Sequence, residues 1–225
     1  RRTPEDTNMK NLLYKEFTLA ASPLTYIFIA FSVMVFIPGY PILVGAFFVC
    51  LGIFYSFRNA REDGDVTYTA LLPVRKSDVA VAKCLFSVTV EMISFLLCLI
   101  FAYIRSTVLV SVGPYRTNPM LPANFVYLGA VLVIFALFNS VFVSGFYKTA
   151  YRLGAPFIAF SVAAFAVITV SEALWHFPGL GFLGAVADGK MPIRALIFAI
   201  CALFYIAVTL LSIKSSGRKF EKIDL

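Results

Sequence analysis

Long apolar runs constrain the fold of this chain more than any other feature. Six runs lie at about residues 20–37, 42–57, 84–104, 125–147, 155–175 and 195–213. A membrane-spanning helix needs roughly 20 mostly apolar residues, and the last four runs reach that length. The first two runs are shorter, and the first reaches a full span only if residues 17–23 also enter the membrane. A re-entrant hairpin therefore stays open as the alternative to two full spans.

Composition points to the same class of protein. Apolar residues make up 60% of the chain and charged residues 14%, with a mean hydropathy of +0.88. Soluble proteins are about half apolar and a quarter charged. We therefore expect an all-α, polytopic membrane protein with six transmembrane helices, forming a single transmembrane domain over residues 9–225. Residues 1–8 carry no apolar pattern and are expected to be disordered or to derive from an expression vector.

The basic residues predict an orientation. With six spans, fifteen of the 19 Lys and Arg residues fall in segments on the same side as the two termini. Because Lys and Arg accumulate in cytoplasmic loops, both termini are expected in the cytoplasm of a multi-pass protein of the plasma membrane. The net charge of +7 is thus an orientation signal and gives no reason to expect nucleic acid as a partner. The opposite side holds Arg105, Arg116, Lys190 and Arg194.

Motifs that would mark an enzyme or a metal site are not convincing in this sequence. The segments 179–184 and 184–190 fit glycine-rich nucleotide patterns, but no strand precedes them, and Met191 follows the lysine where a P-loop needs Ser or Thr. All four cysteines fall inside apolar runs and form no CxxC pair. We expect no catalytic residues, no metal and no cofactor on this chain.

A short amphipathic helix is expected before the first run. Leu12, Leu13 and Phe17 follow Met9 at helical spacing and form one apolar stripe, with Lys10, Lys15 and Glu16 off it. This pattern is typical of a helix that lies in the membrane interface. A plain cytoplasmic extension of the first span is the alternative.

Polar residues inside apolar runs are candidates for a transport pathway, because they are costly in a membrane. Glu91, Asn139 and Tyr205 fall at similar depth in three runs, as does Ser161 in a fourth. They would either line a pathway or only satisfy the carboxylate by hydrogen bonds. Near the opposite ends of the runs, Glu172 and His176 share one helix face. They would form a gate with Arg105 and Arg194, or a surface pair.

A charged segment, residues 60–78, separates the second and third runs. Its acidic turn around Gly64 is followed by a stretch, 66–72, that fits a short helix ended by Pro73. An exposed helix carrying Tyr68, Leu71 and Leu72 has apolar surface to bury, which favours a partner protein.

Residues 63–83, DGDVTYTALLPVRKSDVAVAK, resemble the corresponding loop of ABC-2-type exporter permeases. The resemblance implies a half-transporter: two permease chains, expected to be identical, with cytoplasmic ATPase subunits that hold the ATP and Mg. It also implies that residues of this segment couple to the ATPase, namely Asp63, Asp65, Thr67, Tyr68, Leu71, Leu72, Arg75 and Lys76.

The small permeases that the chain resembles most include the exporter subunit for phenol-soluble modulins, which are amphipathic peptide toxins of Gram-positive bacteria. A bacterial exporter of amphipathic peptides or other hydrophobic cargo, surrounded by membrane lipid, is therefore the expectation. An ion-coupled secondary transporter that uses Glu91 is the alternative.

Overall fold

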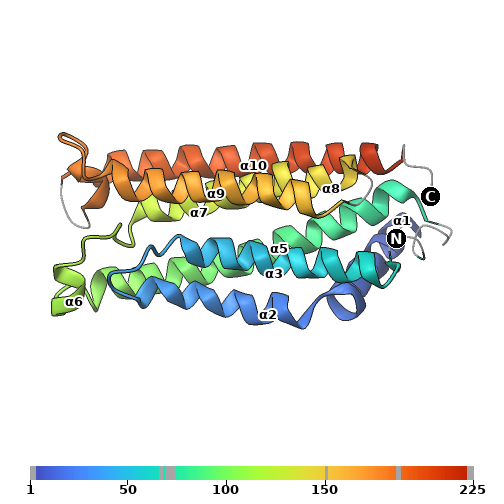
Figure 1. Ribbon diagram of the computed structural model, residues 1–225, viewed down its shortest axis with the longest axis horizontal. Helices are drawn as coiled ribbons and strands as arrows, with labels where there is room; N and C mark the ends of the chain where they lie inside the picture. The colour runs from blue at the N-terminus through green and yellow to red at the C-terminus, as the bar shows by residue number, and fades with distance from the viewer. Residues whose placement is uncertain (1–3, 66–67, 69–73, 150–151, 186–188, 222–225) are drawn as a thin grey trace.

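The computed structural model describes residues 4–65, 68, 74–149, 152–185 and 189–221, and all regular structure in these residues is helical. The long helices lie along one axis, with both termini at one end and α6 at the other (Figure 1). We call these the terminal end and the far end. The helices are α1 (Pro4–Lys15), α2 (Pro23–Ile29), α3 (Val44–Glu62), α5 (Lys76–Thr107), α6 (Gly113–Arg116), α7 (Phe125–Leu137), α8 (Ser144–Lys148), α9 (Gly154–Leu174) and α10 (Met191–Glu221).

The chain bends sharply before the first apolar run. A π-helical segment, Glu16–Ala20, follows α1, and α2 then begins at Pro23, where the missing N–H of proline costs no helical hydrogen bond. The two arms of this bend, Met9–Ala20 and Pro23–Phe36, meet at 89°. The helix of the first run therefore begins at Pro23, and α1 crosses the bundle at its terminal end.

A hairpin joins α2 to α3. Ala30–Phe36 continues α2 as a 3-10 helix, and Gly39 adopts a φ of 71° in the turn that follows. The return helix packs closely because Gly52 has no side chain: a Cβ there would lie 2.7 Å from Cβ of Phe28. Thr25 adds a hydrogen bond, since its hydroxyl donates to the Gly52 carbonyl at 2.6 Å. Small residues and hydroxyl groups serve the same purpose at other membrane helix interfaces.

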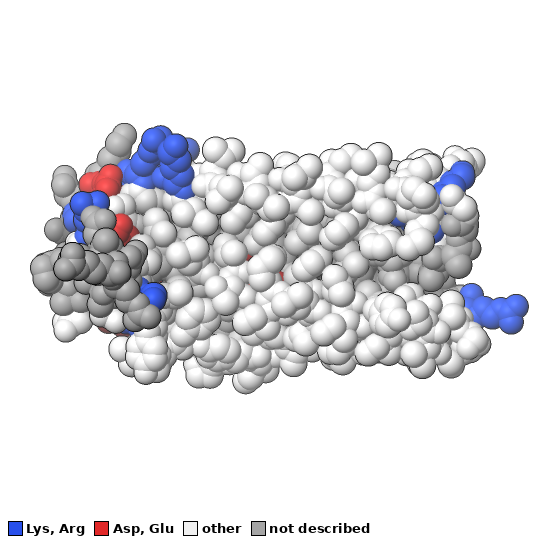
Figure 2. Space-filling view, turned by 180° about the vertical axis from the view of Figure 1, so that it is seen from behind, with Lys and Arg blue, Asp and Glu red and all other residues white. Residues whose placement is uncertain are grey.

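Four helical segments among the described residues are long and apolar enough to cross a membrane: α5, the continuous helix Phe125–Lys148, α9 and α10. Counting the bent pair as one span gives up to five. The protein is therefore a multi-pass helical membrane protein, while six spans remains a prediction. The predicted span that is missing from this count is α3, which ends in the charged sequence RNARE. Figure 2 shows charged side chains gathered at the two ends of one face, with a broad and almost uncharged zone between them.

Candidate functional site

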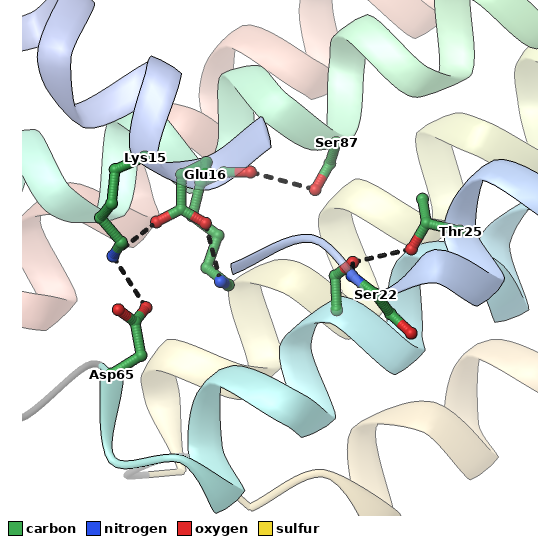
Figure 3. Close-up of polar contacts among 8 residues, drawn as sticks. Lys15, Glu16, Ser22, Thr25, Asp65 and Ser87 are labelled. Atoms are coloured by element: carbon green, nitrogen blue, oxygen red, sulfur yellow. Dashed lines mark hydrogen bonds and ion pairs between the residues drawn. The ribbon is translucent and has the colours of Figure 1, made fainter. Parts of the chain in front are cut away.

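A row of alternating charges connects three parts of the chain at the terminal end (Figure 3). The ammonium group of Lys15 lies 2.8 Å from Oδ2 of Asp65 and 3.1 Å from Oε1 of Glu16. The other oxygen of Glu16 lies 2.9 Å from the ammonium group of Lys83. These ion pairs join the segment after α3, the end of α1 and the first half of α5. We call these four residues the charge relay.

The inner half of the charge relay is buried. Glu16 and Lys83 are each 2% exposed, and the Lys83 ammonium also lies 5.3 Å from the centre of the Phe57 ring. At the outer half, the side chains of Lys15 and Asp65 are 17% and 21% exposed. Buried charges are tolerated when they are paired and hydrogen-bonded, so this geometry is tightly specified.

The structure corrects the expected position of Glu16. The sequence interpretation placed it with Lys15 on the polar side of the first helix, whereas its side chain is buried. The reason is the helical spacing itself: at about 100° per residue, Glu16 falls between Leu12 and Leu13 on the apolar side of the helix. Of the predicted stripe, Leu12 is buried, and Leu13 and Phe17 are partly buried against the core. Contact of this stripe with the membrane interface remains a prediction.

The predicted coupling segment is only partly described. Thr67, Leu71 and Leu72 lie outside the described residues. Asp63 directly follows α3 as its C-cap. The backbone N–H of Tyr68, an exposed residue, donates to the Gly64 carbonyl at 2.9 Å. On the other side of the segment, Arg75 and Lys76 stand at the start of α5. The coupling role of these residues remains a prediction.

A second polar cluster lies midway along the bundle. Oε2 of Glu91, a fully buried residue on α5, accepts hydrogen bonds from Nδ2 of Asn139 at 2.9 Å and from the hydroxyl of Tyr205 at 2.8 Å. Asn139 also donates to the Thr209 hydroxyl at 3.2 Å. Asn139 belongs to a π-helical segment, Phe138–Val143, of the kind often found at functional sites. The cluster thus joins α5 to α10 and to the helix that includes Asn139.

The sequence interpretation missed part of this cluster. Ser161, expected at the same depth, instead donates to the Phe157 carbonyl of its own helix. Thr209 and Ser212 were not singled out, although Ser212 donates to the Asn139 carbonyl. The sequence did contain a pattern that could have revealed them. From Tyr205 onward, polar residues that are buried in α10 recur at helical spacing, at Tyr205, Thr209, Ser212 and Ser216.

At the far end, three side chains of the predicted gate contact backbone groups. Oε2 of Glu172 accepts a hydrogen bond from the N–H of Leu121 at 2.8 Å. The guanidinium of Arg105 donates to the Val35 carbonyl, and that of Arg194 to the Phe182 carbonyl at 2.8 Å. His176 is exposed, and its ring lies 4.0 Å from that of Trp175. A gate formed by Glu172 and His176 remains a prediction.

No three His, Cys, Asp or Glu side chains gather as a metal site would require in the part of the chain that the structure describes. Comparison with protein families gives a clear result: the family model described as "ABC-2 family transporter protein" matches residues 11–221. The chain belongs to this family. It is thus the permease component of an ABC transporter, a transmembrane subunit that works with a separate ATPase subunit. No curated protein and no solved structure matched this permease.

Proposed function

We propose that this ABC-2 permease is the membrane subunit of an ATP-driven bacterial exporter. Two identical chains with six spans each, and both termini in the cytoplasm, would form a pathway that opens alternately to either side. The partner ATPase subunits would hold the ATP and Mg. Amphipathic peptides or other hydrophobic molecules would be the cargo. Support for the orientation comes from the excess of basic residues on the side of the termini.

The observation that carries the proposal is the charge relay. Residues 63–76 would rest on the ATPase, and Asp65 stands at the start of this segment. Its ion pair with Lys15 connects the segment to α1, and Glu16 connects α1 to Lys83 of α5. A displacement of the segment by the ATPase would therefore reach a long membrane helix through paired charges.

The relay and the buried cluster share one helix. Lys83 and Glu91 are eight residues apart on α5, which corresponds to about 12 Å along the helix axis. A shift of α5 at its terminal end would move the Glu91 carboxylate against Asn139 and Tyr205. The proposal thus gives Glu91 a place in the pathway without requiring that it carry ions.

The test is to purify the permease with its ATPase from native membranes and to measure export-coupled ATP hydrolysis after reconstitution. Asp65→Asn removes the charge that pairs with Lys15, so the ATPase should still co-purify while hydrolysis no longer responds to cargo. The matched control is Arg58→Gln, which breaks an exposed pair with Glu62 at the same end and should leave coupling intact. Undiminished export by Asp65→Asn would contradict the role of the relay.

Changing both Leu71 and Leu72 to Asp tests the partner itself. Two carboxylates on the apolar side of the proposed coupling helix should prevent co-purification of the ATPase, as judged by mass spectrometry of the purified complex. If the ATPase still binds this variant with full stoichiometry, the docking surface lies elsewhere.

An ion-coupled transporter is the second candidate, and one observation favours it. Oε1 of the fully buried Glu91 has no hydrogen-bond partner among the described residues, which leaves it able to take a proton or a cation. This candidate predicts gradient-driven flux from the reconstituted permease alone, lost in Glu91→Gln. The exporter predicts no flux from the permease without its ATPase.

A further inference from the structure

Two cavities lie next to each other at the far end of the bundle. One measures about 460 Å³, and we call it the polar cavity because its lining includes Arg105, Arg116, Asn118 and Trp175. The other measures about 480 Å³ and is mainly apolar, lined by α5, α7 and α10. Ser106 and Ala123 line both, so the two cavities adjoin. Each has the size of a small-molecule site.

The polar cavity has donors that lack acceptors. Nδ2 of Asn118 and Nε1 of Trp175 are buried, and neither has a hydrogen-bond partner among the described residues. The amide of Asn118 is fixed in this orientation, because its Oδ1 accepts from the N–H groups of Gly39 and Met120, each at 3.1 Å. Since buried donors are nearly always paired in folded proteins, this cavity is suited to a ligand with acceptor atoms.

The charged side chains that line the two cavities are all basic. Arg105 and Arg116 line the polar cavity, Arg194 lines the apolar one, and no carboxylate of the described residues lines either. Glu172, on the helix that precedes Trp175, is held by the N–H of Leu121. On the face shown in Figure 2, the far end displays basic side chains and no acidic ones. An acceptor-bearing ligand of this site is therefore expected to be anionic.

The apolar cavity opens toward the membrane. Leu99 and Tyr103 of α5 and Met191 of α10 line it and are exposed on the outside of the bundle. Both helices belong to the candidate membrane spans, so this surface meets lipid. A basic cavity near the helix ends and an apolar cavity beside it match the two parts of an anionic phospholipid. We propose that these cavities bind an anionic phospholipid of the adjoining leaflet. Its phosphate would lie near Arg105 and Arg116, and an acyl chain would lie in the apolar cavity.

The sole tryptophan of the chain, Trp175, makes the proposal measurable. The full chain is placed in phosphatidylcholine nanodiscs that contain phosphatidylglycerol with a nitroxide on an acyl carbon close to the headgroup. Nitroxide-labelled phosphatidylcholine is the parallel probe. Labelled phosphatidylglycerol should quench Trp175 fluorescence at about a tenfold lower mole fraction, as expected for one or two charge-assisted hydrogen bonds.

Asn118→Asp is the decisive variant. It keeps the Oδ1 acceptor but replaces the free donor with a negative charge, so the preference for phosphatidylglycerol should disappear. Asn59→Asp makes the same change at the terminal end and should retain the preference. Arg116→Gln alters an exposed side chain at the cavity and should weaken the preference several-fold even if Asn118→Asp does not fold.

Equal quenching by the two labelled lipids, or an unchanged preference in both cavity variants, would overturn the proposal. Loss of the preference on addition of inorganic phosphate would also overturn it, because the site would then bind a free anion. No ATPase or nucleotide is present in this measurement. Its failure would therefore leave the proposed exporter function untouched.

Discussion

Removal of the Glu16 carboxylate should destabilise the fold more than removal of the Lys83 ammonium, although the two groups form one ion pair. In the part of the chain that the structure describes, Lys83 pairs with one carboxylate, Glu16, and its other close charge contact is the ring of Phe57. Glu16 also contacts Lys15 at 3.1 Å. Glu16→Met thus leaves a buried ammonium without a carboxylate, whereas Lys83→Met leaves a carboxylate that still has a partner.

The magnitudes follow from the cost of an unpaired buried charge. Breaking a buried pair by removing one partner costs about 3–5 kcal/mol. An unpaired buried group can also become neutral by a change of protonation. At pH 7 this change costs about 4.6 kcal/mol for an ordinary lysine and about 3.7 kcal/mol for an ordinary glutamate, and an unpaired charge cannot cost more than that. Glu16→Met should therefore lower the free energy of unfolding by about 3–4.5 kcal/mol, close to the limit for lysine. Lys83→Met should lower it by about 1–3 kcal/mol, since Lys15 still compensates Glu16.

The double variant Glu16→Met and Lys83→Met completes the test. It removes both charges and fills the site with side chains of similar volume, so its stability should lie within about 2 kcal/mol of the wild type. Unfolding in mixed micelles with increasing sodium dodecyl sulfate, followed by helical circular dichroism, gives the free energies. As a control, changing both Arg58 and Glu62 to Met removes an exposed pair and should cost at most about 1 kcal/mol. A Lys83→Met variant as unstable as Glu16→Met would refute the reasoning, as would a double variant less stable than either single one.

Two further changes test the packing and the buried cluster. Gly52→Ala should lower the free energy of unfolding by about 1–3 kcal/mol, because the new methyl group would lie 2.7 Å from Phe28; Gly154→Ala, with nothing within 4 Å, should be nearly neutral in the same assay. Tyr205→Phe removes one of two hydrogen bonds to a buried carboxylate and should cost about 1.5–3 kcal/mol, whereas Tyr103→Phe, at an exposed position, should cost almost nothing. Equal losses in a variant and its control would contradict either prediction.

The long helices could be predicted from the sequence because hydrophobicity alone determines which segments enter a membrane. The ends of these helices could be predicted less accurately from the sequence. The run at 84–104 corresponds to α5, which extends over Lys76–Thr107. An apolar run marks only the part of a helix that crosses hydrocarbon, while the helix continues into more polar turns at either end. Those turns include Lys83 and Arg105, which is why the run-based boundaries left out two of the buried charges of α5.

The charge relay escaped prediction for a different reason. Glu16 was assigned to the polar face because it is charged, although at about 100° per residue it lies between Leu12 and Leu13 on the apolar side. The partner of Glu16 lies 67 positions further along the chain. Local periodicity contains no information about such a contact. The mid-bundle cluster was more accessible to sequence reasoning, because Glu91 and Asn139 occupy similar depths in two runs that must cross the same membrane.

The position of buried charges on α5 bears on how this permease changes shape. Lys83, Glu91 and Arg105 fall within an arc of about 80° on this helix, at 3.6 residues per turn. Lys83 and Arg105 bind groups of the N-terminal part of the chain, Glu16 and the carbonyl of Val35.

Glu91 instead binds Asn139 and Tyr205, which belong to the layer of α7 to α10 in Figure 1. If the two layers separate during transport, the contacts of Lys83 and Arg105 can persist, whereas both hydrogen bonds of Glu91 must break. A carboxylate that loses its partners within a membrane needs water, a proton or cargo in their place. Under that condition, the opening of this bundle would be coupled to what occupies its centre, whether the energy comes from ATP or from an ion gradient.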